Sequence, residues 1–195
     1  EWPRGRRPHS TRNCHPSMRI IAGKAGRLAI KVPSAVARPT TDFVRQAIFS
    51  IISERIHEAP VLDLFAGSGA IGLEALSRGA ASCVFVDEHR QSIQVMGENL
   101  TKSRLEGARV VKSDVTSYLK KDTATYDLIF ADPPYYKNAT DKDHVGLLLK
   151  SGLLPARLAP GGWFVAEIAT TQATPETEGW ELVTRREYGS STNLL

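Results

Sequence analysis

The chain has 195 residues, 42% of them hydrophobic and 24% charged, and carries a formal net charge of +4. This length and apolar content suffice for a full hydrophobic core, so we expect one domain over residues 18–195. No apolar run approaches the roughly 20 residues that a membrane helix needs, and residues 1–17 lack the apolar stretch of a signal peptide. The two cysteines form neither a disulfide framework nor a paired zinc motif, so we expect a reducing, cytoplasmic setting without a metal site.

The positive charge is concentrated near the N-terminus. Residues 1–17 contribute +3, residues 18–45 contribute +5, and residues 46–195 contribute −4. Such localised basicity is typical of a phosphate-binding face, with a merely solvated charged face as the alternative. The candidate phosphate contacts are Arg19, Lys24, Arg27, Lys31 and Arg38.

Residues 1–17 contain three prolines and four arginines but no aliphatic side chains, so we expect a disordered basic tail. Met18 resembles a natural start, and the preceding residues are either foreign sequence or a flexible basic arm. Residues 18–32 contain two short apolar runs around a Lys-Ala-Gly turn, which predicts a small β-hairpin appended to the main sheet. A helix should then run to about residue 56, with Thr40 or Thr41 as its cap.

From residue 61 onwards, short apolar runs alternate with helical patterns, which is typical of a doubly wound α/β sheet. The sheet should be mostly parallel, with residues 18–40 as a hairpin and loop and residues 41–195 as the core. Two final strands, at about 180–187 and 191–195, should close the sheet as an antiparallel hairpin. The other predicted strands are 61–65, 82–87, 108–112, 126–131 and 163–168; the predicted helices are 70–78, 89–104, 115–121, 141–150 and 152–158, with a turn at 160–162.

The segment 61–76, VLDLFAGSGAIGLEAL, joins a buried strand to a helix through a glycine turn. Gly67, Gly69 and Gly72 satisfy the G-x-G-x-x-G pattern, and Asp87 ends the next predicted strand, where a ribose-binding acid is sought. The pattern is weak alone, and a plain glycine turn is the structural alternative. Its β-α-β context favours a ligand at the carboxyl ends of the strands, either a dinucleotide or S-adenosylmethionine (SAM).

Asp63 discriminates between these two ligands. A carboxylate just before the glycine turn opposes a pyrophosphate but suits the ammonium and sulfonium groups of SAM. The turn also lacks Gly-Lys-Ser/Thr, which excludes a P-loop. The backbone amides of residues 67–69 can hold the methionine carboxylate of SAM without a cationic side chain.

Two motifs extend this interpretation to a known family. Asp63-Leu64-Phe65-Ala66-Gly67-Ser68-Gly69 resembles the SAM-binding loop of class I methyltransferases, and Asp132-Pro133-Pro134-Tyr135 resembles the D-P-P-Y signature of amino-methyltransferases that modify exocyclic base nitrogens. With MRIIAGKAGR at 18–27, RPTTD at 38–42 and LEALSRGA at 73–80, residues 18–195 resemble bacterial guanine-N2 methyltransferases of small-subunit (16S) ribosomal RNA. The resemblance implies a Rossmann-like class I fold, SAM as cofactor and ribosomal RNA as partner, bound by the basic residues named above.

The resemblance also implies cofactor contacts. It places the 38–42 stretch along the cofactor and substrate cleft, and it places Asp114 where similar enzymes contact the adenine. Asp87 and Asp114 have a helix-capping role as the structural alternative. The expected cofactor-binding residues are Thr40, Asp63, Phe65, Gly67, Ser68, Gly69, Asp87 and Asp114.

Asp132, Pro133, Pro134 and Tyr135 are the expected catalytic residues. The exocyclic amine of guanine is a poor nucleophile because its lone pair is conjugated into the ring. Hydrogen bonds from the amine to the Asp132 carboxylate and the Pro133 carbonyl would favour a pyramidal nitrogen that faces the SAM methyl group. The prolines stiffen the loop and Tyr135 can stack on the extruded base, so catalysis is largely positioning. A rigid turn alone explains neither the acid nor the aromatic residue.

Three alternatives stay open. D-P-P-Y also occurs in adenine-N6 methyltransferases, and only the whole-chain resemblance favours guanine. A nicotinamide-dependent oxidoreductase fits G-x-G-x-x-G but leaves D-P-P-Y unexplained, and a non-catalytic RNA-binding protein would need neither Asp132 nor Tyr135. We expect a monomer that acts on ribosomal RNA in an assembled small subunit. Phe43 departs from the family pattern, in which this position is commonly basic.

Overall fold

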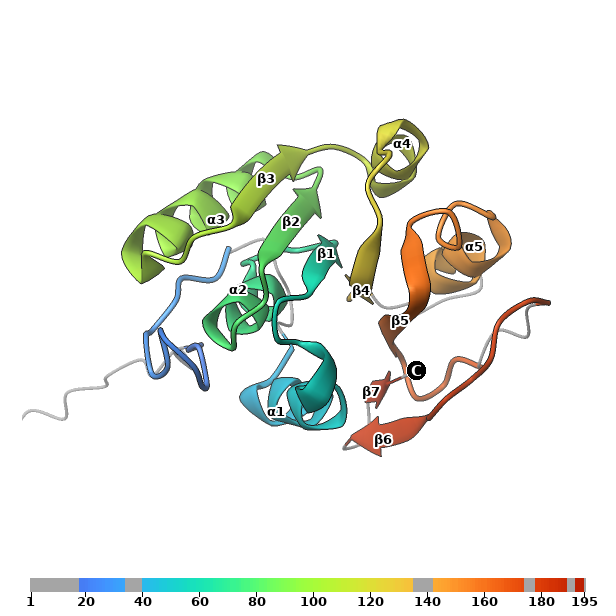
Figure 1. Cartoon of the computed structure of the whole chain (residues 1–195), viewed down its shortest axis with the longest axis horizontal. Coiled ribbons are helices and arrows are strands. Elements are labelled where there is room, and N and C mark those ends of the chain that lie inside the picture. Colours follow the sequence, from blue (N-terminus) through green and yellow to red (C-terminus); the bar gives the residue numbers. More distant parts are fainter. Residues whose placement is uncertain (1–17, 34–39, 135–141, 174–177, 189–191, 195) are drawn as a thin grey trace, which may run out of the picture.

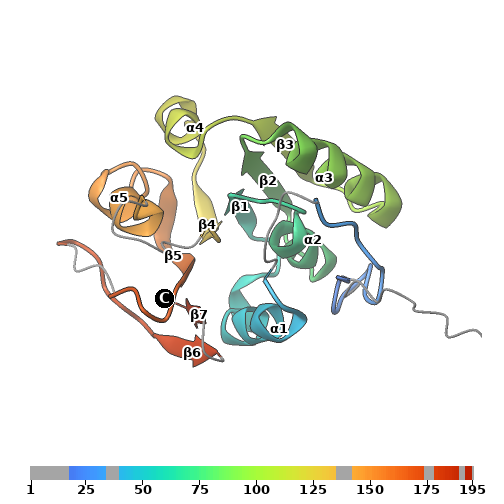
Figure 2. The same ribbon diagram turned by 180° about the vertical axis from the view of Figure 1, so that it is seen from behind.

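The computed structural model of the chain describes residues 18–33, 40–134, 142–173, 178–188 and 192–194. The predictions for the 1–17 tail, Arg38 and Tyr135 therefore lie outside the described residues. Within the described ranges, seven strands form one sheet in the order β3-β2-β1-β4-β5-β7-β6, with helices on both faces (Figure 1, Figure 2). The strands from β3 to β5 are parallel, and β7 is antiparallel to both of its neighbours. This confirms the predicted α/β class and its antiparallel edge.

Most element bounds lie within a residue or two of the predictions. None of the described helices is long and apolar enough to cross a membrane. The strands are β1 Pro60–Leu64, β2 Ser82–Asp87, β3 Ala108–Lys112, β4 Tyr126–Ala131, β5 Leu158–Ile168, β6 Arg186–Tyr188 and β7 Thr192–Leu194. The helices are α1 Asp42–Ile51, α2 Ala70–Ser77, α3 Arg90–Ser103, α4 Val115–Lys121 and α5 His144–Lys150, with a 3-10 turn, Ser53–Arg55, after α1.

Alternating side chains of the central strands build one core on each face of the sheet. Val61 and Phe85 point to the face covered by α1, α2 and α3, where Phe49 and Met96 join them. Leu62 and its neighbours on the opposite face pack against α4 and α5. Because the central strands are buried on both faces, their sequences are continuous apolar runs. An acid within such a run, such as Asp63 in β1, therefore stands out.

The segment around β5 differs from the prediction. Residues 152–156 form turns instead of a helix, and β5 already begins at Leu158, which pairs with Tyr126 of β4. The predicted turn at 160–162 is an irregularity within β5, next to a shift in the β4–β5 register. The closing hairpin is also shorter than predicted, because β6 and β7 have three residues each.

Residues 18–33, the N-terminal segment, form a short hairpin-like turn that lies against α2 and α3, as predicted, with backbone hydrogen bonds from Ile20 to Leu28 and from Ile30 to Met18. A single antiparallel bridge between Arg19 and Ala29 replaces the two predicted strands. The buried Glu74 carboxylate of α2 accepts hydrogen bonds from the backbone amides of Ile21 and Ala22, at 2.6 and 3.0 Å. Buried Asn99 of α3 donates to the Lys31 carbonyl and accepts from the Lys31 amide. The segment is therefore fixed to the body by backbone contacts.

Candidate functional site

Three acids meet at the carboxyl ends of adjacent strands. Asp63 lies in β1, Asp87 ends β2 and Asp132 follows β4, and both β2 and β4 pair with β1 in parallel. The carboxyl ends of parallel strands lie at one edge of a sheet, and this edge is the usual ligand site of open α/β folds. The three predicted site residues therefore lie at one end of the molecule.

The glycine turn between β1 and α2 depends on left-handed backbone conformations. Gly67 and Gly69 have φ of 55° and 78°, and Phe65 adopts φ of 60°, which is costly for a residue with a side chain. A Cβ on Gly69 would lie 3.1 Å from Met96. The turn therefore needs glycine for both its conformation and its packing. Phe65 presents its ring edge-on to His144, with the ring centroids 5.2 Å apart.

Asp63 is buried and acts as the cap of α2. Its Oδ2 accepts a hydrogen bond from the Gly72 amide at 2.9 Å, near the helix N-terminus, where Gly69 supplies no side-chain cap. Burial raises the pKa of Asp63 to about 7; the Gly72 hydrogen bond opposes this shift and the nearby Asp87 charge adds to it. This capping contact was not predicted from the sequence, and an ammonium contact from SAM stays a prediction.

Asp87 holds the glycine turn against β2. One carboxylate oxygen accepts from the Gly67 amide at 2.9 Å, and the other accepts from the His89 amide at 2.8 Å, at the start of α3. The helix-capping alternative is not confirmed, because α3 begins at Arg90 and has no side-chain cap, and the contact with the turn was not predicted. Each carboxylate oxygen can accept more than one hydrogen bond, so these contacts leave capacity for ribose hydroxyls.

The acids at this end fit a cationic ligand. Among the residues that the structure describes, no lysine or arginine is paired with Asp63 or Asp87, and the charge of Asp87 contributes to the raised pKa of Asp63. A ligand that carries an ammonium and a sulfonium would relieve this accumulation of negative charge, whereas a pyrophosphate would add to it. The residues present are therefore compatible with SAM.

Thr40 and Thr41 have separate roles. Thr41 caps α1 by accepting from the Val44 amide at 3.3 Å, which leaves the Thr40 hydroxyl to donate to Asp132 Oδ2. This bond joins the start of α1 to the end of β4. Burial raises the pKa of Asp132 to about 8, with a further rise from Glu167 and a smaller opposing effect of the Thr40 hydrogen bond. Perturbed acids of this kind are common at functional sites.

Glu167 is a member of this site that the sequence interpretation missed. It lies in β5, is only 4% exposed, and comes directly after Ala166, which pairs with Ala131 of β4. The parallel register therefore places Glu167 beside Asp132, and Glu167 lines a small cavity together with Pro133 and Pro134. An acid inside the apolar run WFVAEI was the available signal.

Asp114 follows β3 at the same edge of the sheet, where the amide of its neighbour Ser113 donates to the Asp87 carbonyl at 3.0 Å. Asp114 is exposed and caps α4 by accepting from the Ser117 amide at 2.8 Å, a hydrogen bond that lowers its pKa. Its capping alternative is confirmed, and a contact with adenine stays a prediction. Ser68 is buried, and its hydroxyl lies 3.6 Å from the sulfur of Met18. Pro133 is buried and Pro134 is exposed.

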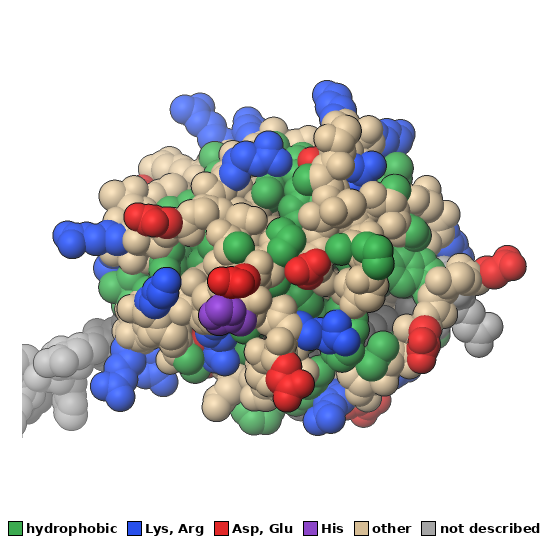
Figure 3. Space-filling model, viewed as in Figure 1, with side chains coloured by type: hydrophobic (Ala, Val, Ile, Leu, Met, Phe, Trp, Pro, Cys, Tyr) green, Lys and Arg blue, Asp and Glu red, His purple; other side chains and the backbone are tan. Residues whose placement is uncertain are grey.

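The predicted phosphate contacts lie on the N-terminal segment. Figure 3 shows Lys and Arg side chains projecting at the lower left, where Figure 1 places this segment. Arg19 pairs with Asp42 at 3.3 Å and Lys31 pairs with Glu98 at 2.6 Å, both at the surface. For Lys24 and Arg27 the described residues contain no ion-pair partner. Exposed pairs of this kind exchange partners at little cost.

A parallel sheet, a glycine turn after β1, an acid at the end of β2 and an Asp-Pro-Pro sequence after β4 define a SAM-dependent class I methyltransferase. Comparison with known proteins agrees with this class. The family model described as Conserved hypothetical protein 95 matches residues 18–195, and the chain belongs to that family.

Named relatives are also methyltransferases. The chain is 38% identical over 138 residues to ribosomal RNA small subunit methyltransferase D of Escherichia coli strain K12, covering 70% of this chain and 69% of that protein. It is 30% identical over 184 residues to the protein of the same name from Haemophilus influenzae, covering 92% and 93%. The solved structure of a hypothetical protein of Thermus thermophilus matches with a TM-score of 0.75 and 33% identity, covering 91% and 98%. These findings favour methyl transfer over the nicotinamide-dependent alternative.

Proposed function

We propose that this chain transfers a methyl group from SAM to the exocyclic N2 of a guanine in small-subunit ribosomal RNA. The proposal extends the substrate in the names of its relatives to this chain. One structural observation carries it: Asp132, at the end of β4, is held by Thr40 next to the glycine turn and directly before Pro133. A carboxylate fixed between the cofactor loop and a stiff Pro-Pro turn suits a target amine.

In the proposed reaction, the chain orients the amine, and bound SAM supplies the electrophilic methyl group. The Asp132 carboxylate and the Pro133 carbonyl accept the two N–H bonds of the amine, so that its lone pair is turned out of the base plane. The pKa of Asp132 is raised to about 8 in the free protein, and the positive charge of bound SAM would lower it, which favours the carboxylate that accepts these bonds and can receive a proton late in the reaction. Thr40 fixes the rotamer of this carboxyl group through its hydroxyl.

The substrate is proposed to be an assembled small ribosomal subunit, with the protein acting as a monomer in the cytoplasm. The N-terminal segment supports an RNA partner because its short length carries Arg19, Lys24, Arg27 and Lys31. Backbone hydrogen bonds to Glu74 and Asn99 fix this segment, so its side chains meet a phosphate backbone with little further ordering.

The direct test is to incubate the protein with isotopically labelled SAM and unmethylated small subunits, digest the RNA and identify the labelled nucleoside by mass spectrometry. We expect N2-methylguanosine, with more product from assembled subunits than from naked RNA. Duplex DNA containing adenine is the matched alternative substrate, because D-P-P-Y also serves adenine-N6 enzymes. Label in adenine, or the absence of label from RNA and subunits alike, would contradict the proposal.

A further inference from the structure

Glu167 is an acid of the candidate site that the proposed reaction leaves without a role. It follows Ala166 in β5, and Ala166 pairs with Ala131 of β4, directly before Asp132. Neighbouring strands lie about 4.8 Å apart, and side chains at matched positions project from the same face of a sheet. The negative charge of Glu167 also raises the pKa of Asp132, so the two carboxyl groups interact. The ends of β4 and β5 therefore present two acids side by side.

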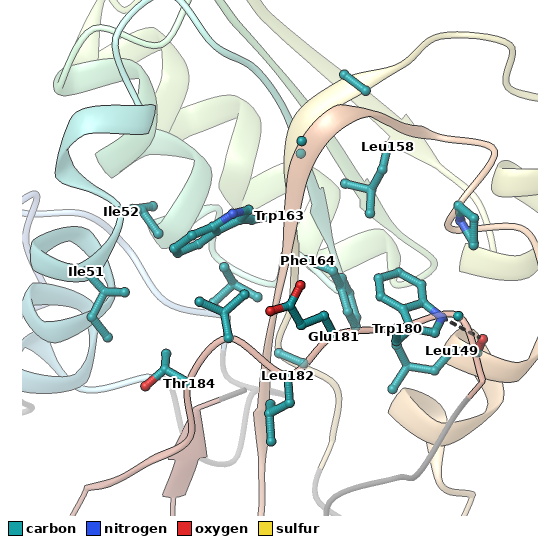
Figure 4. A pocket seen from close by; sticks show the side chains of 18 of the residues that line it. Ile51, Ile52, Leu149, Leu158, Trp163, Phe164, Trp180, Glu181, Leu182 and Thr184 are labelled. Atoms are coloured by element: carbon teal, nitrogen blue, oxygen red, sulfur yellow. Dashed lines mark hydrogen bonds between the residues drawn. The ribbon is translucent and has the colours of Figure 1, made fainter.

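Glu167 belongs to the polar end of β5. The middle of this strand lines a large apolar groove beside residues 179–184 (Figure 4). Neither Glu167 nor Asp132 is among the described residues that line this groove. Glu167 instead lines a small cavity with Pro133 and Pro134, the residues that follow Asp132. It thus lies next to the place where the proposed reaction holds the target amine.

The acceptors at this place match one edge of guanine. In the proposed reaction, the Asp132 carboxylate and the Pro133 carbonyl accept the two N–H bonds of the amine. Guanine carries a further donor, N1–H, next to this amine on the same edge, whereas adenine carries an acceptor, N1, next to its own amine. An ionised carboxylate accepts hydrogen bonds and cannot donate them. A third acceptor beside the first two therefore suits guanine and opposes adenine.

We propose that the Glu167 carboxylate accepts a hydrogen bond from N1–H of the target guanine and thereby selects guanine over adenine. This inference rests on the proposed function and adds to it the residue that chooses between the two bases compatible with D-P-P-Y. Glu167 is only 4% exposed, so the bond forms where water cannot replace a missing partner. A base without the N1 proton would place a lone pair against a buried carboxylate, an arrangement that gives strong discrimination.

The test compares guanine with 2-aminopurine, which keeps the 2-amino group but has an unprotonated N1. Small subunits are assembled with either base at the nucleotide that the labelled-SAM experiment identifies, and kcat/KM is measured for both. The unsubstituted chain should prefer guanine by about 100-fold or more. Glu167→Gln keeps the shape of the side chain and adds amide N–H donors, which can bond to an unprotonated N1. This variant should methylate 2-aminopurine faster and guanine more slowly than the unsubstituted chain, so that the preference falls at least about tenfold.

Lys142→Gln is the matched control, because Lys142 lines the same cavity as Glu167 but adds no acceptor. This variant should keep the preference for guanine. Saturable binding of SAM by Glu167→Gln, measured by calorimetry, reports that the variant is folded.

The unsubstituted chain alone can overturn the inference, by methylating guanine and 2-aminopurine equally well. The inference also fails if Glu167→Gln slows both bases by the same factor and keeps the preference, since Glu167 would then support the site without contacting the base. Both outcomes leave methylation of guanine intact, so the proposed function would stand. If label enters no guanine at all, the proposed function itself fails and this inference fails with it.

Discussion

Charged side chains are used differently at the acidic end of the sheet and in the basic N-terminal segment. Asp63 and Asp87 are 2% and 7% exposed, and their carboxylates bond to backbone amides of the glycine turn and its helices. The Arg19 and Lys31 side chains are 60% and 67% exposed and pair with surface carboxylates. Buried charges bonded to the backbone fix a geometry, whereas exposed charges are screened and exchange partners. We therefore expect substitutions at the acidic end to change the reaction and those in the segment to change only RNA binding.

We expect the largest effect at Glu74, because this buried acid of α2 holds the basic N-terminal segment in place. Its carboxylate accepts from the Ile21 and Ala22 amides and from Arg78. Glu74→Ala leaves these donors without a partner and should lower the free energy of unfolding by about 3 kcal/mol or more. Urea denaturation measures this loss. Glu98→Gln, which removes the exposed partner of Lys31, is the control and should leave the midpoint unchanged. If the two variants unfolded at the same urea concentration, the buried Glu74 would contribute no more to stability than the exposed Glu98.

Asp87 tests whether the acidic end serves the cofactor. Asp87→Ala removes acceptors for the ribose hydroxyls as well as the bond to the Gly67 amide. SAM affinity should fall by about 1.5–3 kcal/mol, as measured by calorimetry. Asp114→Ala is the comparison at an exposed helix cap and should weaken SAM binding less. If the folded Asp87 variant bound SAM normally, Asp87 would only hold the glycine turn and would not contact the cofactor.

The pH dependence of stability should reveal the raised pKa of Asp132. The pKa of Asp132 is raised to about 8, so its folded form holds a proton that the unfolded chain releases near pH 4. The stability from this proton is complete below about pH 4 and is lost as the pH rises through 8. Asp132→Asn should therefore lose less stability than the unsubstituted chain between pH 5 and 9, as measured by urea midpoints. If the urea midpoints of the two proteins changed equally with pH, the pKa of Asp132 would not be raised.

The basic segment should act through salt-dependent RNA binding alone. Neutralising Arg19, Lys24, Arg27 and Lys31 together with glutamine should reduce the log-log salt slope of RNA binding by about 0.7–0.9 for each lost phosphate contact. SAM affinity should not change. Lys120→Gln with Lys121→Gln, on exposed positions of α4, is the control for net charge and should keep the slope. The prediction fails if both variants shift the slope equally.

The sequence was most informative where structure depends on local pattern. The bounds of β2, β3 and β4 agree with the predicted strands, because buried parallel strands are continuous apolar runs with polar ends. Asp87, Asp114 and Asp132, which end or follow these strands, lie at one edge of the sheet. Contacts between distant segments were not predictable in this way. Only the position of β4 distinguishes Thr40, bonded to Asp132, from the capping Thr41, and only the β4–β5 register brings Glu167 beside Asp132. The early start of β5 likewise reflects pairing with β4 overriding a Pro-Gly-Gly turn signal.

The central claim is that Asp132 orients the target amine while the glycine turn binds the cofactor. Single-turnover methylation of small subunits by Asp132→Asn, with SAM affinity measured on the same preparation, separates these roles. We expect the rate to fall by about 10²–10⁴-fold and SAM affinity to stay within about threefold, because Asn keeps the shape but cannot receive a proton. Thr40→Val removes only the hydroxyl that holds Asp132. Its single-turnover rate should lie between the rates of the unsubstituted chain and of Asp132→Asn. A near-normal single-turnover rate in Asp132→Asn would contradict the account.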